Sequence, residues 1–332
     1  MCFTTMKHFS LLLLLTFVSA LLSSCAGRRS SVSDTRMALG TYVQIIIVSD
    51  RKGVDKAKAA IEETYGMVAG YEERFDYRRE GGALSRFNRG TTLARDEDGL
   101  LYDLIKEAVS AAELTGGFFD PTVLPVTQLW GFDSDSPKLP HDNQIREALK
   151  NVGYKRVEVH EDRIVKPADV RLDLSGIAKG RIVDLASDFL KSGGYHDFLV
   201  NAGGDIYVNG RNAEGKKWRI AIQDPVRPDH YSAMVNKTDS AVVTSGDYER
   251  FFIEGEKRYC HLFNPFTGYP GSDIRSATIL AGDAMFADAI ATAVFVMGSK
   301  EGLAFLHRNG IEGYLIYNGD GVESKSTPGF WR

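Results

Sequence analysis

The sequence predicts an α+β fold, in which helices pack on a mixed β-sheet. Segments with strand-like and helix-like hydrophobic patterns are interspersed along the 332 residues, but they do not alternate in the regular strand–helix–strand units that build parallel sheets. The sequence also shows no repeat of the length that builds a solenoid. A chain of this size has ample core for one large domain or two modest ones.

The first residues are typical of a lipoprotein signal peptide. Lys7 and His8 precede an apolar run that is too short to span a membrane. Small residues directly before Cys25 resemble the bacterial lipobox, in which the cysteine is lipidated and becomes the new N-terminus. The alternative is an ordinary secretory signal with an incidental cysteine. We expect a signal peptide over residues 1–24, a linker over 25–35 and one domain over 36–332.

A lipidated Cys25 would anchor the protein to a bacterial membrane, facing the periplasm or the cell exterior. The formal net charge of −4 gives no reason to expect a nucleic-acid partner. Of the three cysteines, Cys2 lies in the leader and Cys25 is committed to lipid, so only Cys260 remains. An intramolecular disulfide is therefore excluded, and a thiolate metal site is not expected.

Hydrophobic periodicity assigns the elements in order along the chain. A turn over residues 37–41 leads into a β-branched strand over 41–48. Pro121 keeps the preceding residue out of a helix, so 118–122 is expected to be a loop. Helices are predicted over 54–75, 100–114, 142–151, 284–297 and 301–308, and a further helix starts near Lys179 and stops at Gly193. The other predicted strands cover 156–160, 163–166, 198–200, 206–208, 218–223, 241–245, 249–253, 257–263, 277–280 and 314–317.

A stretch over residues 173–210 combines a strand end, a glycine turn and a helix start. Asp173 ends an apolar run, Gly176 lies in the turn, and Lys179 lies near the start of the next helix. Free N–H groups at a helix start attract anions, and a lysine adds full charge. The same pattern suits an ordinary packed strand–helix–strand unit, and neither a P-loop nor a Rossmann fingerprint is present. A phosphate-bearing ligand is thus one of two interpretations.

Two oxygen-bearing side chains share one face of an alanine-rich helix. Asp288 and Thr292 are four residues apart and are flanked by small apolar residues. A carboxylate in such surroundings is unfavourable unless it is paired or binds a metal, and a hard cation such as Mg²⁺ suits these ligands. The alternative is an aspartate near a helix N-terminus and a threonine that bonds back to the helix backbone.

His261 lies near the end of a predicted strand, before an Asn-Pro turn. Strand ends that lead into loops often carry functional residues, although a single histidine is more often a hydrogen-bonded structural residue. The sequence contains no HExxH motif and no recognisable Ser/His/Asp arrangement.

Taken together, these motifs resemble the ApbE family of FAD:protein FMN transferases, and they do so over nearly the whole mature chain. One departure is a Phe-Asn pair at 263–264, where the family more often has an aliphatic residue and an aspartate. The matching segments, in order, are MALGT at 37–41, LSRFN at 84–88, GFFDPTV at 117–123, LWGF at 129–132, DLSGIAKG at 173–180, NAGGDI at 201–206, TSGDYERFF at 244–252, HLFNPFTGYP at 261–270 and ADAIAT at 287–292.

The resemblance implies transfer of FMN from FAD to a threonine or serine hydroxyl of a target protein, with release of AMP and with Mg²⁺ on the pyrophosphate. It implies that Asp288, Thr292 and the carbonyl of Gly176 bind the metal, that Lys179 contacts the phosphates, and that His261 activates the acceptor hydroxyl. The implied FAD contacts are Met37, Tyr77, Phe118, Phe119, Asp120, Asp173, Lys179 and Leu262.

The implied partners are FAD and an exported flavin-acceptor protein, such as a subunit of a membrane redox complex. Two other functions use the same site. With water as the nucleophile it would hydrolyse FAD to FMN and AMP, and without chemistry it would be a flavin-binding lipoprotein. The presence of Lys179, Asp288 and Thr292 favours chemistry over storage.

Overall fold

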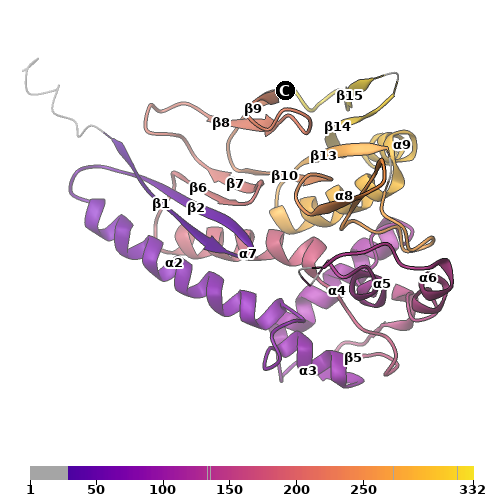
Figure 1. Ribbon diagram of the computed structural model, residues 1–332. Coiled ribbons are helices and arrows are strands. Elements are labelled where there is room, and N and C mark those ends of the chain that lie inside the picture. The colour runs from indigo at the N-terminus through magenta and orange to yellow at the C-terminus, as the bar shows by residue number, and fades with distance from the viewer. Residues whose placement is uncertain (1–28, 133, 135, 272, 320) are drawn as a thin grey trace, which may run out of the picture.

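An eight-stranded sheet in the order β1-β2-β6-β7-β10-β13-β14-β15 forms the centre of the computed structural model (Figure 1). The structure describes residues 29–132, 134, 136–271, 273–319 and 321–332, so the expected signal peptide and Cys25 lie outside the described residues. The strands are β1 Ser30–Ala38, β2 Thr41–Ser49, β6 Phe198–Ala202, β7 Asp205–Asn209, β10 Ser240–Gly246, β13 Ile274–Ala281, β14 Glu312–Asn318 and β15 Val322–Ser326.

The α+β class is confirmed, but the sheet is not mixed. Each pairing of neighbouring strands in the described part of the chain is antiparallel. The pairs β1–β2, β6–β7 and β14–β15 are close in sequence. The helices lie in the connections from β2 to β6 and from β13 to β14, and the two connections between β7 and β13 carry hairpins.

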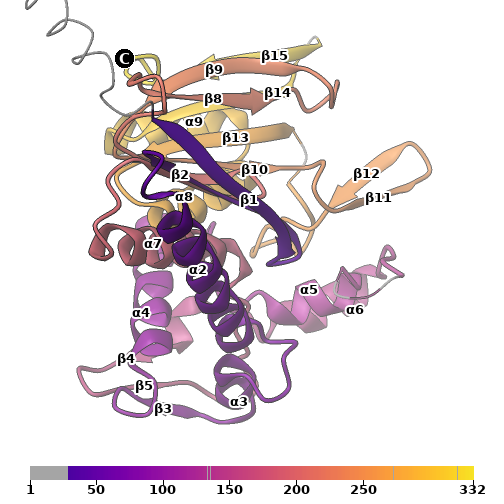
Figure 2. The same cartoon turned by 90° about the vertical axis from the view of Figure 1, so that its left-hand side faces the viewer.

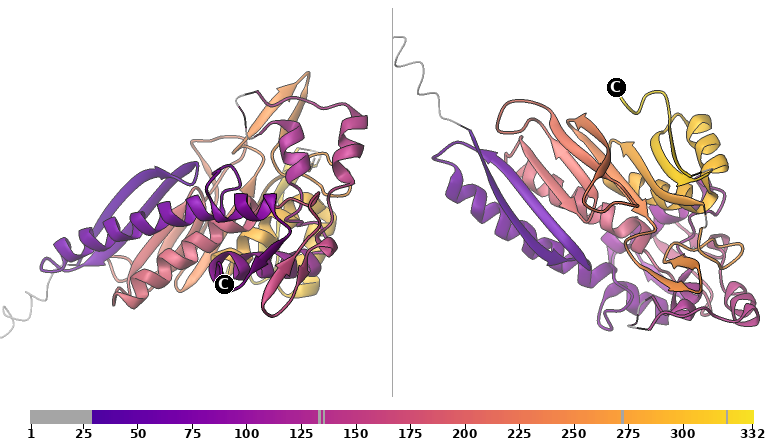
Figure 3. Two further views of the ribbon diagram at one scale, coloured as in Figure 1. Left: turned by 90° about the horizontal axis from the view of Figure 1, so that it is seen from below. Right: turned by 45° about the horizontal axis from the view of Figure 1, so that its top comes forward.

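Helices cover one face of the sheet and form the larger core with it. Alternate strand residues such as Ile45, Ile47 and Ile279 point to this face and are fully buried. Figure 3 shows α2 and α7 running side by side beneath the sheet. The helices of this layer are α2 Val54–Phe75, α4 Gly99–Leu114, α7 Ser175–Ser192, α8 Ala284–Met297 and α9 Ser299–Asn309.

A two-stranded sheet covers the opposite face. Strands β8 (Trp218–Gln223) and β9 (Tyr231–Lys237) pair with each other. The alternating pattern of β8 buries Trp218, Ile220 and Ile222 in a second core, against strand residues of the central sheet. Both faces of the central strands are therefore covered, whereas the edge strands β1 and β15 keep exposed residues.

Smaller elements surround one end of the helical layer. In Figure 2 the hairpin β11–β12 projects beside α5 and α6, and an aromatic cluster around Trp130 joins these elements. Their bounds are α3 Ala83–Arg89, β3 Thr92–Ala94, α5 Leu124–Trp130, α6 Asp142–Leu149, the short 3₁₀ helix η2 Tyr154–Arg156, β4 Glu158–Val159, β5 Arg163–Val165, β11 Phe251–Glu254 and β12 Lys257–Cys260.

Strand β1 corrects the sequence prediction at the start of the domain. Residues 30–35 were expected to belong to a linker, but the whole of β1 pairs with β2. The residues of β1 are mostly polar, so their intrinsic propensity does not predict a strand. They form one because β2 pairs with their backbone. The predicted turn over 37–41 is therefore shorter. Leu39 and Gly40 both have positive φ, 56° and 69°, as in a two-residue type I′ hairpin.

The start of α7 differs in a similar way. Ser175 and Gly176 are not a turn before the helix but its first helical residues, because α7 begins at Ser175. Asp173 stabilises this start, since its Oδ1 accepts a hydrogen bond of 2.9 Å from the N–H of Ser175. Lys179 consequently lies in the second turn of α7, which agrees with its predicted place near a helix start.

Candidate active site

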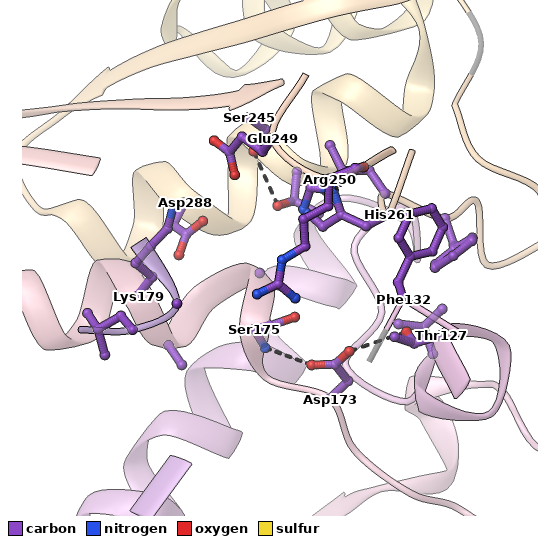
Figure 4. A pocket seen from close by; sticks show the side chains of 18 of the residues that line it. Thr127, Phe132, Asp173, Ser175, Lys179, Ser245, Glu249, Arg250, His261 and Asp288 are labelled. Carbon is purple, nitrogen blue, oxygen red and sulfur yellow. Dashed lines mark hydrogen bonds between the residues drawn. The ribbon is translucent and has the colours of Figure 1, made fainter. Parts of the chain in front are cut away.

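A cavity of about 360 Å³ lies where α7 and α8 meet the β1–β2 turn and the segment after β10 (Figure 4). It brings together most of the residues that the sequence singled out, although they are far apart along the chain. Those that line it are Tyr77, Phe118, Phe119, Asp120, Asp173, Gly176, Lys179, His261, Leu262, Asp288 and Thr292. Met37 does not line it and is 65% exposed on β1, whereas its neighbours Leu39 and Gly40 do.

The Asp288 carboxylate faces the cavity from α8 and is held from α7. Its Oδ2 accepts a 3.0 Å hydrogen bond from the N–H of Gly180. Only 4% of the residue is exposed. Burial raises the pKa of Asp288 to about 6, although Lys179 and the Gly180 N–H act in the opposite direction. A cation bound here would stabilise the ionised carboxylate, because it would replace the hydration that is lost on burial.

Thr292 and Gly176 line the same cavity as Asp288 and offer a hydroxyl and a carbonyl oxygen. The Thr292 hydroxyl is 3.5 Å from the hydroxyl of Ser245, and it is 3.2 Å from the point where a Cβ on Gly176 would lie. No three His, Cys, Asp or Glu side chains form a metal-binding group within the described ranges. The set here is one carboxylate, one hydroxyl and one carbonyl, which fits Mg²⁺ because that ion is commonly held by one or two carboxylates, water and substrate phosphates.

Lys179 is paired with a carboxylate that sequence reasoning did not assign. Asp205 is 1% exposed and lies 3.3 Å from the Lys179 ammonium. The contact is to Oδ1 of Asp205, and no other hydrogen bond to this carboxylate is formed among the described residues. Burial by itself would lower the pKa of Lys179, but Asp205, Glu249 and Asp288 outweigh it and raise that pKa. Lys179 is therefore a fixed positive charge in the cavity.

His261 forms another wall of the cavity at the end of β12. Its Nδ1 lies 3.3 Å from the carbonyl oxygen of Arg250, and its ring is 6.4 Å from that of Phe132. Desolvation lowers the pKa of His261, and Glu249 opposes the shift. A neutral imidazole with one nitrogen directed at a carbonyl can accept a proton on the other.

Arg250 extends into the cavity beside His261 (Figure 4). One of its terminal nitrogens lies 3.0 Å from the point where a Cβ on Gly40 would be. The guanidinium therefore reaches from the root of the β11–β12 hairpin to the β1–β2 turn on the other side. Arg78 and Lys179 also line the cavity, as do carboxylates such as Glu249 and Asp288. The site therefore offers cationic side chains to an anionic ligand and carboxylates to a cation.

Both carboxylate oxygens of Asp120 accept hydrogen bonds from the protein itself. Its Oδ1 accepts hydrogen bonds from the N–H and the hydroxyl of Thr122, at 2.8 and 2.6 Å. Its Oδ2 accepts one of 2.9 Å from the N–H of Tyr154. Asp173 is oriented similarly by Ser175 and by the Thr127 hydroxyl, which donates at 3.2 Å. Both aspartates shape the cavity wall, and the contacts of Asp120 give it a structural role.

Aromatic side chains supply flat apolar surface at the cavity. Phe118 packs edge-on against Phe266 with ring centroids 5.2 Å apart. Phe119 is 3% exposed and lies against Gly176 at the start of α7. Tyr77 lies below Arg78, whose guanidinium is 5.8 Å from the ring centroid. Such faces bind planar ring systems by stacking or edge contacts.

A family model described as the ApbE family matches residues 39–315. The chain belongs to the ApbE family. It is 31% identical over 308 residues to an FAD:protein FMN transferase of Vibrio cholerae, covering 90% of this chain and 91% of the relative. It is 30% identical to the enzyme of that name from Haemophilus influenzae, covering 93% of each chain.

Solved ApbE structures share the fold. The flavin transferase ApbE from Vibrio cholerae superposes with a TM-score of 0.82 at 30% identity, over 91% of this chain and 98% of that one. The ApbE protein from Thermotoga maritima superposes with a TM-score of 0.83 at 32% identity, over 91% and 100%. This ApbE-family member is therefore a transferase, and flavin transfer is the activity that its relatives share.

The glycines before Asp205 give a prediction for this ApbE-family cavity. Gly203 has φ 59°, and a Cβ there would lie 2.4 Å from the hydroxyl of Thr41. Gly203→Ala should lower the free energy of unfolding by roughly 2–4 kcal/mol, from the left-handed backbone and from overpacking. It should also weaken ligand binding, because Thr41 lines the cavity. Chemical denaturation and ligand titration measure both effects.

The adjacent Gly204 provides the matched control. It also has positive φ, 100°, but a Cβ there meets nothing within 4 Å. Gly204→Ala should therefore show the backbone effect alone. The double change Gly203→Ala with Thr41→Ala removes the clashing hydroxyl and methyl groups and should regain part of the loss. Equal effects of the two single variants on ligand binding would contradict the packing explanation.

Proposed function

We propose that this ApbE-family chain transfers FMN from FAD to a threonine or serine hydroxyl of an exported protein and releases AMP. The observation that carries the proposal is the convergence of an oxygen-donor group, a paired lysine and a histidine on one cavity with aromatic walls. The names of the relatives, FAD:protein FMN transferase, support the same reaction.

In this proposal Lys179 and Arg250 bind the pyrophosphate of FAD. Asp205 holds Lys179 at 3.3 Å, which keeps the ammonium in place before the ligand arrives. Arg250 adds a second charge from the opposite wall. The rings of Tyr77 and Phe118 offer surfaces for the aromatic parts of FAD, and Phe119, Leu262 and Asp173 line the same cavity.

Gly176, Asp288 and Thr292 are the residues that would hold Mg²⁺. When bound, the ion would supply Lewis-acid stabilisation of the charge that develops on the pyrophosphate as the P–O bond breaks. The carboxylate of Asp288 contributes the formal negative charge, and the neutral oxygens of Gly176 and Thr292 complete the protein's share of the ligands.

His261 would accept the proton of the acceptor hydroxyl. The hydroxyl oxygen forms a bond to the phosphorus of the FMN moiety, its proton moves to the imidazole, and the bond to the AMP phosphate breaks with the electron pair leaving on AMP. The lowered pKa of His261 keeps the ring neutral and ready to accept at neutral pH. Lys179 and Arg250 balance the charge on the phosphates.

One assay separates this function from its two alternatives. The chain is incubated with FAD and Mg²⁺, with and without an acceptor domain, and AMP release and covalent FMN are measured. AMP released only with the acceptor, with FMN on its threonine, indicates a transferase. AMP released equally without the acceptor indicates an FAD pyrophosphatase, and no AMP in either case indicates a flavin-binding protein. Either of the last two results would contradict the proposal.

A lipid anchor at Cys25 is the proposed means of membrane attachment. Within the ranges that the structure describes, no helix has the length and apolar character needed to cross a bilayer. Replacing Cys25 with serine should remove the lipid and move the mature protein from the membrane fraction to the soluble fraction. Membrane fractionation with metabolic acyl labelling measures this, and an equally membrane-bound Cys25→Ser protein would contradict it.

A further inference from the structure

Helices α7 and α8 contact each other through a ladder of residues spaced by one helical turn. Gly176 lies against Thr292, with 3.2 Å from the ideal Cβ position of the glycine to the hydroxyl. Four residues along α7, the N–H of Gly180 donates to Asp288, which is four residues earlier in α8. The order of contacts is reversed on the two helices, so they run antiparallel, and successive contacts are about 6 Å apart along each axis.

Asp184 makes the next contact of this ladder, one turn beyond Gly180. Its Oδ1 accepts a 2.8 Å hydrogen bond from the N–H of Ala284, and its Oδ2 accepts one of 2.8 Å from the N–H of Met285. These N–H groups belong to the first turn of α8 and have no partner within their own helix. Asp184 is 8% exposed, so both bonds are sheltered from water.

The middle contact of this ladder, between Gly180 and α8, leaves no space for a side chain larger than hydrogen. A Cβ on Gly180 would lie 2.3 Å from the carbonyl oxygen of Ala284 and 2.9 Å from the Cβ of Asp288. The helices therefore touch through backbone at this point, and a small rotation of α8 moves Asp288 directly. Asp184 fixes the N-terminal end of α8 one turn before Asp288, which opposes such a rotation.

We propose that Asp184 is a positioning residue for the metal site, which it serves by bonding the first turn of α8 to α7 and so setting the separation of Gly176 from Asp288 and Thr292. The inference rests on the proposed metal site. Asp184 does not line that cavity and acts only through the placement of α8. Groups that orient metal ligands from outside the ligand set commonly change metal affinity by about 10- to 100-fold when removed.

Asp283 gives a matched control on the same helix end. It is the N-cap of α8, and its Oδ1 accepts a 2.8 Å hydrogen bond from the N–H of Phe286. Asp283→Ala removes a carboxylate cap from the same first turn, but this cap belongs to α8 itself and makes no bond to α7. It should lower the thermal unfolding temperature without changing the placement of Asp288.

The test is titration calorimetry of Mg²⁺ into the full chain, together with the Mg²⁺ dependence of FMN transfer at saturating FAD. Asp184→Ala should weaken Mg²⁺ binding by about 10- to 100-fold and raise the Mg²⁺ requirement equally, while Asp283→Ala leaves both unchanged. Asp184→Asn keeps one acceptor oxygen, so its Mg²⁺ affinity should lie between those of the wild type and Asp184→Ala. If Asp184→Ala does not fold, the asparagine variant decides the question by the same criterion.

Wild-type Mg²⁺ affinity in the Asp184 variants would overturn the inference and leave the proposed function standing. Equal weakening by Asp184→Ala and Asp283→Ala would also overturn it, because helix stability would then explain the effect. If the wild type itself neither binds nor requires Mg²⁺, the proposed metal site fails and the inference fails with it.

Discussion

Replacing Asp288 with alanine is expected to abolish FMN transfer while the protein remains folded. The substitution removes the only carboxylate of the proposed metal site, and a metal ion contributes several kcal/mol to such reactions, so the rate should fall by roughly 10³-fold or more. The residue lies in an alanine-rich helix and is 4% exposed, so the variant removes a buried charge and little volume. Thermal unfolding and single-turnover FMN transfer measure the two quantities.

A matched control for Asp288→Ala removes a carboxylate of the same kind from outside the cavity. Asp188 on α7 has a side chain that is 67% exposed and pairs with Lys191 at 3.5 Å. Asp188→Ala should retain wild-type transfer. Near-normal turnover of Asp288→Ala at ordinary Mg²⁺, or wild-type activity that survives EDTA, would show that the metal assignment is wrong.

Replacing His261 with alanine should reduce transfer by about 10²–10⁴-fold, the usual effect of losing a general base, and leave the affinity for FAD nearly unchanged. The contacts proposed for FAD come from Lys179 and the aromatic wall. The wild-type rate should fall as the pH drops below the His261 pKa, which burial places lower than its ordinary value of 6.5, because a protonated ring cannot accept a proton. The residual rate of the variant should lack this acidic limb.

Lys179→Ala provides the contrast. It should weaken both FAD affinity and transfer, because a phosphate contact is lost and Asp205 is left as a buried carboxylate without its ion pair. Calorimetric FAD titration and pH–rate profiles of both variants distinguish the roles. A proportional loss of affinity and rate in His261→Ala would mean that His261 is a binding or structural residue and not a base.

Local patterns were enough to predict the elements that carry the site. The spacing of Asp288 and Thr292 placed them on one helical face, and both line the cavity. The pairing of Lys179 with Asp205 was not predictable, because it joins α7 to the start of β7, and no local pattern states which strand lies behind a helix. The position of Arg250 was not predictable either, because its side chain crosses the cavity to the β1–β2 turn, which is far away in the sequence.

The role of Asp120 shows a different limit. Its sequence neighbours match the ApbE family, but a motif does not reveal whether a carboxylate faces a ligand or the protein. Hydrogen bonds from Thr122 and Tyr154 occupy both of its oxygens. Strand β1 was missed because its residues are polar, and its partner β2 had to be in place before its backbone pairing could be recognised.

If Cys25 carries the proposed lipid, the direction of β1 sets how far the cavity can lie from the membrane. The strand has nine residues, so its first residue lies about 30 Å from the turn at the cavity. Five peptide units separate Cys25 from Ser30 and extend at most about 18 Å. With Cys25 lipidated, the reaction centre would be tethered within about 50 Å of the bilayer surface. Acceptors held in the same membrane would then meet it at a high effective concentration, whereas freely diffusing proteins would not.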